Sequence, residues 1–262
     1  MPPPPPPSSS SSSHPERCRP TRPLRAARRR PPQNTAATPA VPSNCAGWTG
    51  LDWPLVLQLA DSALPVGGFA HSGGLEAAWQ LGEVPDRTHL QTFLEASLHQ
   101  AARAALPFVV EAHRQPERLD ELDQLAEAWI SNHVANRASR LQGRAFWTAV
   151  THALLPDSPP APIPGHLAPV FGTILRRLGI PLETTAGLFL FQHLRGIVSA
   201  AVRLGIVGPL EAQALQARLR PSLADWTARA ATWTLDDLAQ PSPLLDLWQG
   251  AQDRLYSRLF QT

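Results

Sequence analysis

The stretch from residue 57 to residue 79, LQLADSALPVGGFAHSGGLEAAW, brings the residue types of a hydrolytic site into a short span. It offers two hydroxyl groups, an imidazole and a carboxylate, on Ser62, Ser72, His71 and Glu76. The strand–turn–helix context of a GxSxG nucleophile is missing. We therefore interpret the stretch as a glycine-rich corner between two helices. Ser72 is the expected N-cap of the second helix, with Glu76 near its first turn.

Other catalytic chemistries are excluded by what the sequence lacks. All 23 basic residues are Arg, so the chain can form neither an ordinary P-loop, which needs a Lys, nor a Lys Schiff base. Cys18 and Cys45 both precede residue 47, which removes thiol chemistry from the remainder of the chain. The nine His are scattered and form no HExxH motif. We expect no catalytic residue and no metal site built from this chain alone.

Composition divides the chain between residues 46 and 47. Residues 1–46 hold 13 of the 29 prolines with seven Arg and one acid, whereas residues 47–262 carry 16 Arg and 20 acids. We expect residues 1–46 to be a disordered Pro/Ser/Arg-rich tail, because so few apolar side chains cannot offset the entropy of ordering. Three roles stay open for it: a solvated extension or mis-assigned start, a targeting segment, and a nucleic-acid-binding arm.

Apolar residues at helical spacing run through residues 47–262, and strand-like alternation is nearly absent. Helices are expected over 86–105, 120–129, 133–155, 166–178, 181–204, 209–219, 222–233 and from 244 toward the end. Residues 181–204 are apolar nearly all round, which is typical of a central helix. We predict a single irregular all-α domain of about eight to ten helices over residues 47–262. No apolar run is long enough to indicate a membrane span.

Four ordered blocks of the sequence resemble the UreF family of urease accessory proteins. They are LQLADSALPVGGFAHSGGLE, ANRASRLQGRAFW (135–147), a segment over 166–208 and SPLLDLWQGAQDRLYSRLFQT (242–262). In the first block, the family's motif loop corresponds to Pro65, Gly67, Gly68, Phe69, His71, Ser72, Gly74, Leu75 and Glu76. Many family members have His-Glu where this chain has Gln252 and Asp253, so a metal or proton role of that His does not carry over.

The resemblance implies a cytoplasmic, non-enzymatic maturation factor for nickel insertion into apo-urease. It implies a homodimer in complex with a UreD/UreH-type scaffold and a UreG-type GTPase, whose GTP hydrolysis the protein modulates. The partner complex would handle Ni²⁺ and GTP, and this chain alone would bind no cofactor. Neither nucleic acid nor a membrane is an expected partner.

Aromatic and basic side chains at the end of the sequence are candidate partner contacts. The last helix is expected to end in side chains typical of interfaces, namely Tyr256, Arg258, Leu259 and Phe260. The alternative is that this end packs back onto the protein's own core.

A second candidate interface lies on the 133–155 helix, where Arg140, Gln142 and Arg144 occupy the family's polar positions. Arg137, Arg140 and Arg144 share one face of this helix. The face either meets a carboxylate or phosphate of a partner or is solvated beside acidic neighbours. Arg203 follows an apolar helix and is expected to be paired or to cap that helix end.

Two mechanisms stay open for the effect on the GTPase: an arginine finger supplied in trans, or a population shift in the partner. Two other functions are weaker alternatives. One is nucleic-acid binding by the Arg-rich tail, which the acidic remainder of the chain argues against. The other is an all-α enzyme with a pocket that the sequence does not reveal.

Overall fold

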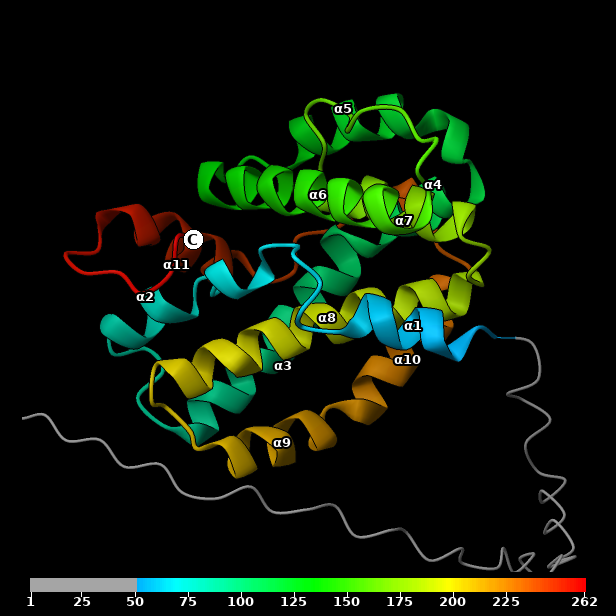
Figure 1. Ribbon diagram of the computed structural model, residues 1–262. Helices are drawn as coiled ribbons and strands as arrows, with labels where there is room; N and C mark the ends of the chain where they lie inside the picture. The colour runs from blue at the N-terminus through cyan, green and yellow to red at the C-terminus, as the bar shows by residue number, and fades with distance from the viewer. Residues whose placement is uncertain (1–50) are drawn as a thin grey trace, which may run out of the picture. The chain divides into compact units, whose positions relative to one another are not determined.

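The computed structural model describes residues 51–262, so the predicted tail lies outside the described residues. Short 3-10 helices occur at Gly68–Ala70 (η1), Pro116–Arg118 (η2), Leu235–Asp237 (η3) and Gln252–Arg254 (η4). The α-helices, shown in Figure 1, are α1 (Trp53–Ala60), α2 (Leu75–Gln80), α3 (Arg87–Ala104), α4 (Leu106–Arg114), α5 (Leu119–Trp129), α6 (His133–Leu154), α7 (Leu167–Arg177), α8 (Leu182–Arg203), α9 (Pro209–Arg218), α10 (Arg220–Ala230) and α11 (Pro243–Ala251). Ten of these α-helices have eight residues or more, and no strand occurs in the described part, which confirms the predicted all-α class.

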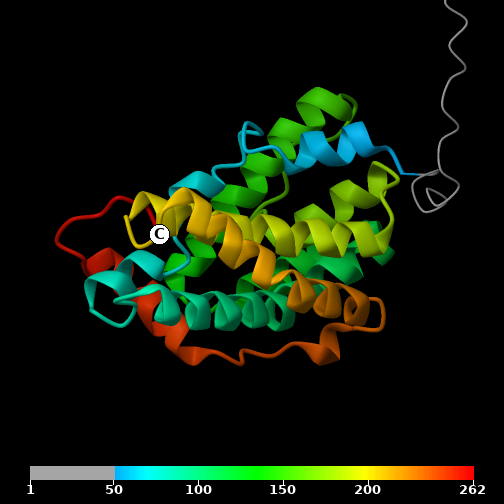
Figure 2. The ribbon, with the colours of Figure 1, turned by 90° about the horizontal axis from the view of Figure 1, so that it is seen from below.

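The central element is α8, as its apolar sequence predicts. It contacts α3, α4, α9 and α10, and Figures 1 and 2 show it running through the middle of the bundle. Among the described helices, α8 alone is long and apolar enough to span a membrane, but more than half of its apolar stretch is buried inside the domain. This burial is typical of a core helix.

Two hydrophobic clusters meet along α8. The first surrounds α4 and α7 and includes Phe146, Phe171 and Phe189, whose ring centroids lie 5.0 and 5.4 Å apart in succession. The second joins α2, α3, α9 and α11 to the C-terminal half of α8 and includes Leu194 and Phe260. Each cluster therefore depends on one half of the same helix.

Local signals place most helix ends where the sequence predicts them. Asp86 caps α3 by accepting hydrogen bonds from the backbone N–H of Thr88 and His89. Gly179 follows α7 with φ of 72°, which matches its predicted left-handed role.

The predicted start of α2 is wrong by two residues. Gly74, with φ of 88°, is the N-cap instead of Ser72, and a Cβ atom there would lie 3.0 Å from the backbone nitrogen of Gln249. A side chain at this position would therefore push α2 away from α11. Ser72 still contributes, because its hydroxyl accepts a hydrogen bond from the Glu76 N–H at 3.4 Å.

The predicted helical end of the chain is also wrong. The helix stops at Ala251, continues as η4 to Arg254, and residues 255–262 are not helical. The reason is a long-range contact: Glu76 accepts hydrogen bonds from the backbone N–H of Leu259 and Phe260, which a helix would need for itself.

Close backbone approach between α6 and the start of α7 gives the first testable prediction. A Cβ atom at Gly143 would lie 2.2 Å from the carbonyl oxygen of Gly165. We expect Gly143→Ala to lower the free energy of unfolding by about 1–3 kcal/mol, measured by urea denaturation. The control is Gly196→Ala in α8, where a Cβ atom has no neighbour within 4 Å. This change should raise stability by up to about 1 kcal/mol, and equal effects would contradict the packing argument.

Candidate functional site

The motif loop and the end of the chain form one structure, held by the buried carboxylate of Glu76. Its side chain is 1% exposed. It accepts hydrogen bonds from the backbone N–H of Leu259 at 2.6 Å and of Phe260 at 3.1 Å, and from the Gln252 side-chain amide at 2.6 Å. We call these four residues the Glu76 clasp. Three donors satisfy a carboxylate that could not otherwise be buried.

Residues 70–72 pair with the last two residues beside the clasp. Gln261 donates its N–H to the Ala70 carbonyl at 2.8 Å, and Ser72 donates its N–H to the Thr262 carbonyl at 2.6 Å. The Nδ1 atom of His71 pairs with the Thr262 hydroxyl. Burial, assisted by the charge of Arg137, lowers the pKa of His71 to about 4, so this imidazole is neutral near pH 7.

The hydrolytic arrangement considered from the sequence is not assembled. His71 pairs with Thr262, and Glu76 is occupied by the clasp. No hydrogen bond joins the His71 ring to Ser72 or Glu76 within residues 51–262. The same range holds no group of three or more His, Cys, Asp or Glu side chains arranged to bind a metal ion.

The remainder of the motif loop lies over α8. Pro65, Gly67 and Phe69 are exposed, whereas Leu75 is fully buried in the second cluster. Gly68 begins η1 and a Cβ atom there would have no neighbour within 4 Å. Close backbone approach therefore occurs at Gly74, against α11 of the same chain, and not at Gly67 or Gly68.

Arg203 joins the motif loop to the end of the chain. Its guanidinium donates to the Phe69 carbonyl and lies 4.3 Å from the ring centroid of Phe260 and 5.1 Å from that of Phe69. The expected ion pair or helix cap is thus replaced by a carbonyl and two aromatic faces, which suit a planar cation.

A second carboxylate, Asp253, anchors the other end of residues 254–258. It accepts two hydrogen bonds from Arg137, at 2.8 and 3.1 Å, and lies 3.1 Å from Arg258 and 3.3 Å from His133. The hydrogen bonds from Arg137 hold the pKa of Asp253 below its usual value. Sequence reasoning noted Gln252 and Asp253 only as departures from the family pattern, and the structure shows that both position the chain end.

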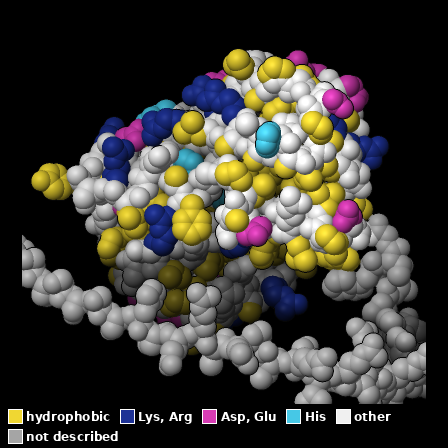
Figure 3. Space-filling view, in the orientation of Figure 1, with side chains coloured by type: hydrophobic (Ala, Val, Ile, Leu, Met, Phe, Trp, Pro, Cys, Tyr) yellow, Lys and Arg dark blue, Asp and Glu magenta, His cyan; other side chains and the backbone are white. Residues whose placement is uncertain are grey.

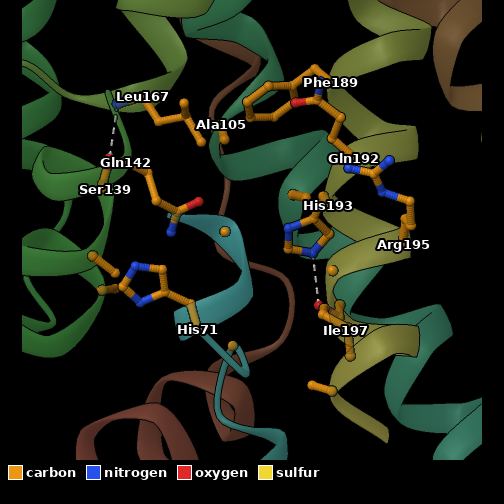
Figure 4. A pocket seen from close by; sticks show the side chains of 18 of the residues that line it. His71, Ala105, Ser139, Gln142, Leu167, Phe189, Gln192, His193, Arg195 and Ile197 are labelled. Carbon is orange, nitrogen blue, oxygen red and sulfur yellow. Dashed lines mark hydrogen bonds between the residues drawn. The ribbon is translucent and has the colours of Figure 1, made fainter. Parts of the chain in front are cut away.

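The three arginines on this face of α6 differ in their contacts. Arg137 is taken by Asp253, while Arg140 lies 3.8 Å from Glu127 and its buried Nε has no partner in the described part of the chain. Arg144 forms no ion pair within residues 51–262, and its aliphatic stem packs against Gly165. Gln142 points into a cavity instead (Figure 4). Figure 3 shows several basic side chains close together on the surface where α6 lies.

Buried polar contacts fix α6 against its neighbours. His166 is fully buried and lies 2.7 Å from Glu127 of α5 and 3.1 Å from the Ser139 hydroxyl of α6. Asp123 accepts the backbone N–H groups of Gly165 and His166, each at 2.6 Å. These contacts hold the face that carries Arg140 and were not evident from the sequence.

The chain end is partly surface and partly core. Tyr256 is fully exposed, and Arg258 and Leu259 also lie at the surface. Phe260 is buried under Arg203 in the second cluster. Packing onto the protein's own core therefore describes Phe260, whereas partner contact by the exposed Tyr256, Arg258 and Leu259 stays a prediction.

Replacing the central carboxylate gives the second testable prediction. In Glu76→Gln, an amide would face the two backbone donors without the carboxylate charge, so we expect the free energy of unfolding to fall by about 1–3 kcal/mol. The amides of Leu259 and Phe260 should exchange hydrogen faster, measured by hydrogen–deuterium exchange. Glu83→Gln, at an exposed glutamate just after α2, is the control and should change neither quantity. Unaltered exchange at Leu259 in Glu76→Gln would contradict the clasp.

Comparisons with known proteins identify the family to which the chain is similar. A UreF family model matches residues 84–220. "Urease accessory protein F" from Arabidopsis thaliana is 37% identical over 235 residues, covering 83% of this chain and 93% of that protein. The protein of the same name from Oryza sativa subsp. indica is 36% identical over 217 residues, covering 78% and 83%. "Urease accessory protein UreF" from Mesorhizobium japonicum is 35% identical over 206 residues, covering 76% and 92%. The chain therefore belongs to the UreF family of urease accessory proteins.

Proposed function

We propose that this protein serves urease maturation as a non-enzymatic adaptor between a UreD/UreH-type scaffold and a UreG-type GTPase, for delivery of nickel to apo-urease. Membership of the UreF family supports the maturation role. The adaptor role is inferred from the segment 254–258, which is anchored at both ends. Asp253 holds its start and the Glu76 clasp its end, while Tyr256 between them makes a fully exposed projection.

An anchored backbone around an exposed aromatic side chain favours binding. Less of the chain has to be ordered when a partner covers Tyr256, and Tyr and Arg are enriched among interface hot spots. The Gln80 side chain adds a third attachment by donating to the Ser257 carbonyl at 3.0 Å. Tyr256, Arg258 and Leu259 therefore form the first partner-binding surface of the proposal.

The neighbouring face of α6 supplies positive charge to the proposed partner-binding surface. Arg140 has only a long contact with Glu127 and an unpaired buried Nε, and Arg144 has no carboxylate partner among the described residues. Such guanidinium groups can donate hydrogen bonds to a partner's carboxylate without breaking a strong internal ion pair. We propose that the partner presents acidic side chains to this face.

The nucleotide and metal chemistry is assigned to the partners. This chain has no Lys for a P-loop, and its described part has no metal-ligating cluster. In the proposal, the GTPase binds GTP and Ni²⁺, and this protein acts as a homodimer that positions the GTPase and modulates its GTP hydrolysis.

The third prediction tests the aromatic projection. Tyr256→Ala in the full chain should weaken binding to the scaffold or the GTPase by at least about tenfold, measured by titration calorimetry. Its melting temperature should not change, because the Tyr256 side chain is fully exposed. Leu210→Ala, on α9 and 89% exposed, is the matched control and should alter neither property. Wild-type affinity of Tyr256→Ala for both folded partners would remove this residue from the interface.

The fourth prediction tests whether Arg140 is an arginine finger for the GTPase. The Arg140 side chain is only 38% exposed and its Nε is buried, which suits docking better than reaching into another protein's active site. We expect Arg140→Ala to weaken the complex but to retain full stimulation of GTP hydrolysis at saturating concentration, which would exclude Arg140 as an arginine finger. A loss of about 10³-fold or more at saturation would identify an arginine finger instead.

A further inference from the structure

A cavity of about 820 Å³ adjoins both hydrophobic clusters, and the adaptor function makes no use of it. Its size lies within the range of small-molecule binding sites. The walls come mainly from α3, α6, α8 and the loop over residues 61–73, and α5, α7, α9 and α11 also contribute. Much of the lining consists of small residues, including Ala101, Ala104, Ala105, Ala135, Ala138 and Gly196. These residues leave the space that larger core side chains would fill.

Three polar side chains from different parts of the chain face this space. Figure 4 shows Gln142 of α6, His71 of the motif loop and His193 of α8 around it. His71 uses Nδ1 for Thr262, and His193 uses Nε2 for the Ser97 hydroxyl at 2.9 Å. The second nitrogen of each ring and the Gln142 amide have no hydrogen-bond partner within residues 51–262. A ligand can therefore receive or donate hydrogen bonds at these three places.

The two imidazoles contribute no positive charge at neutral pH. Burial lowers the pKa of His71 and of His193 to about 4 in each case. An anion would therefore gain no ionic partner from either ring. Both remain available as neutral hydrogen-bonding groups.

Both cations in the cavity walls have contacts within the described part of the chain. Arg195 donates to the Ala60 carbonyl, and Arg203 is held by the Phe69 carbonyl and two aromatic rings. Two acids, Asp61 and Asp246, also line the cavity, and burial raises the pKa of Asp246. Two cations and two acids leave no net formal charge to attract an ion.

We propose that the cavity binds a small uncharged molecule with an aromatic or aliphatic body and one hydrogen-bonding group, which would contact Gln142, His71 or His193. The apolar part of the ligand fills the space between the small residues of α3, α6 and α8. This site is separate from the surface around Tyr256 and does not depend on the adaptor function.

Two fluorescent probes that differ by one charge test the ligand class on the full chain. N-phenyl-1-naphthylamine is neutral with a single N–H donor, and 1-anilinonaphthalene-8-sulfonate has the same skeleton with a sulfonate group. We expect saturable binding of the neutral probe and at least about tenfold weaker binding of the anion. Bound neutral probe should also raise the melting temperature as its concentration increases. Absence of saturable binding, or equal or tighter binding of the anion, would overturn the proposal.

Cavity-filling variants locate the probe. Gly196 lines the cavity, and a Cβ atom there meets nothing within 4 Å, so Gly196→Leu should occupy the space without backbone strain. We expect the neutral probe to bind at least about tenfold more weakly to Gly196→Leu. Gly196→Ala is the matched control and should bind within about twofold of the wild type. Unchanged binding to a folded Gly196→Leu would place the probe elsewhere and overturn the assignment.

A second variant covers the case in which Gly196→Leu does not fold. Gln142→Met keeps the side-chain length but removes the amide, so the neutral probe should bind about fivefold more weakly. Cooperative thermal unfolding of each variant shows whether it is folded before binding is compared. Where Gly196→Leu does not fold, wild-type affinity of a folded Gln142→Met for the neutral probe would overturn the proposal.

Discussion

Burial of the Glu76 carboxylate is the constraint on which the functional end of this molecule depends. Transfer of a carboxylate from water to an apolar interior lowers the stability of the fold by several kcal/mol unless hydrogen bonds compensate for the lost hydration. Here the donors come from residues 252, 259 and 260, far along the chain from α2. The chain must therefore turn back after α11 and run beside residues 70–76. The left-handed Gly74 follows from the same geometry, because only a residue without a side chain lets α2 approach Gln249 closely.

The clasp and the Asp253 ion pairs together explain how a short non-helical segment is held in place. Such a segment has few apolar contacts of its own, and in isolation it would fray. Two carboxylates on either side of Tyr256 fix the segment from both ends, one through backbone N–H groups and the other through Arg137, Arg258 and His133. Arg203 completes the structure by covering Phe260. Polar contacts together with the buried Phe260 ring hold this exposed loop, without a regular secondary structure.

Sequence reasoning succeeded where the determinants are local. Asp86 marks the start of α3, Gly179 follows α7, and the apolar residues of 181–204 indicate the central helix, because caps and periodicity act within a few residues. It failed for residues 255–262, whose conformation depends on Glu76, about 180 positions earlier. It also treated the α6 arginines as one face, whereas Asp253 occupies Arg137 and leaves Arg140 without a close carboxylate. Contacts of this range leave no periodic signal in a single sequence.

The role of Gln252 shows how far the family resemblance extends to individual residues. Gln252, at which the sequence departs from the expected family pattern, donates its amide N–H to Glu76 at 2.6 Å, and its Oε1 is buried without a partner among the described residues. The fold therefore requires an N–H donor at this position. An amide does not titrate near neutral pH and is a poor substitute for imidazole as a ligand of nickel. The clasp thus requires neither proton transfer nor metal binding at residue 252, and in this chain the position serves to fix the exposed segment.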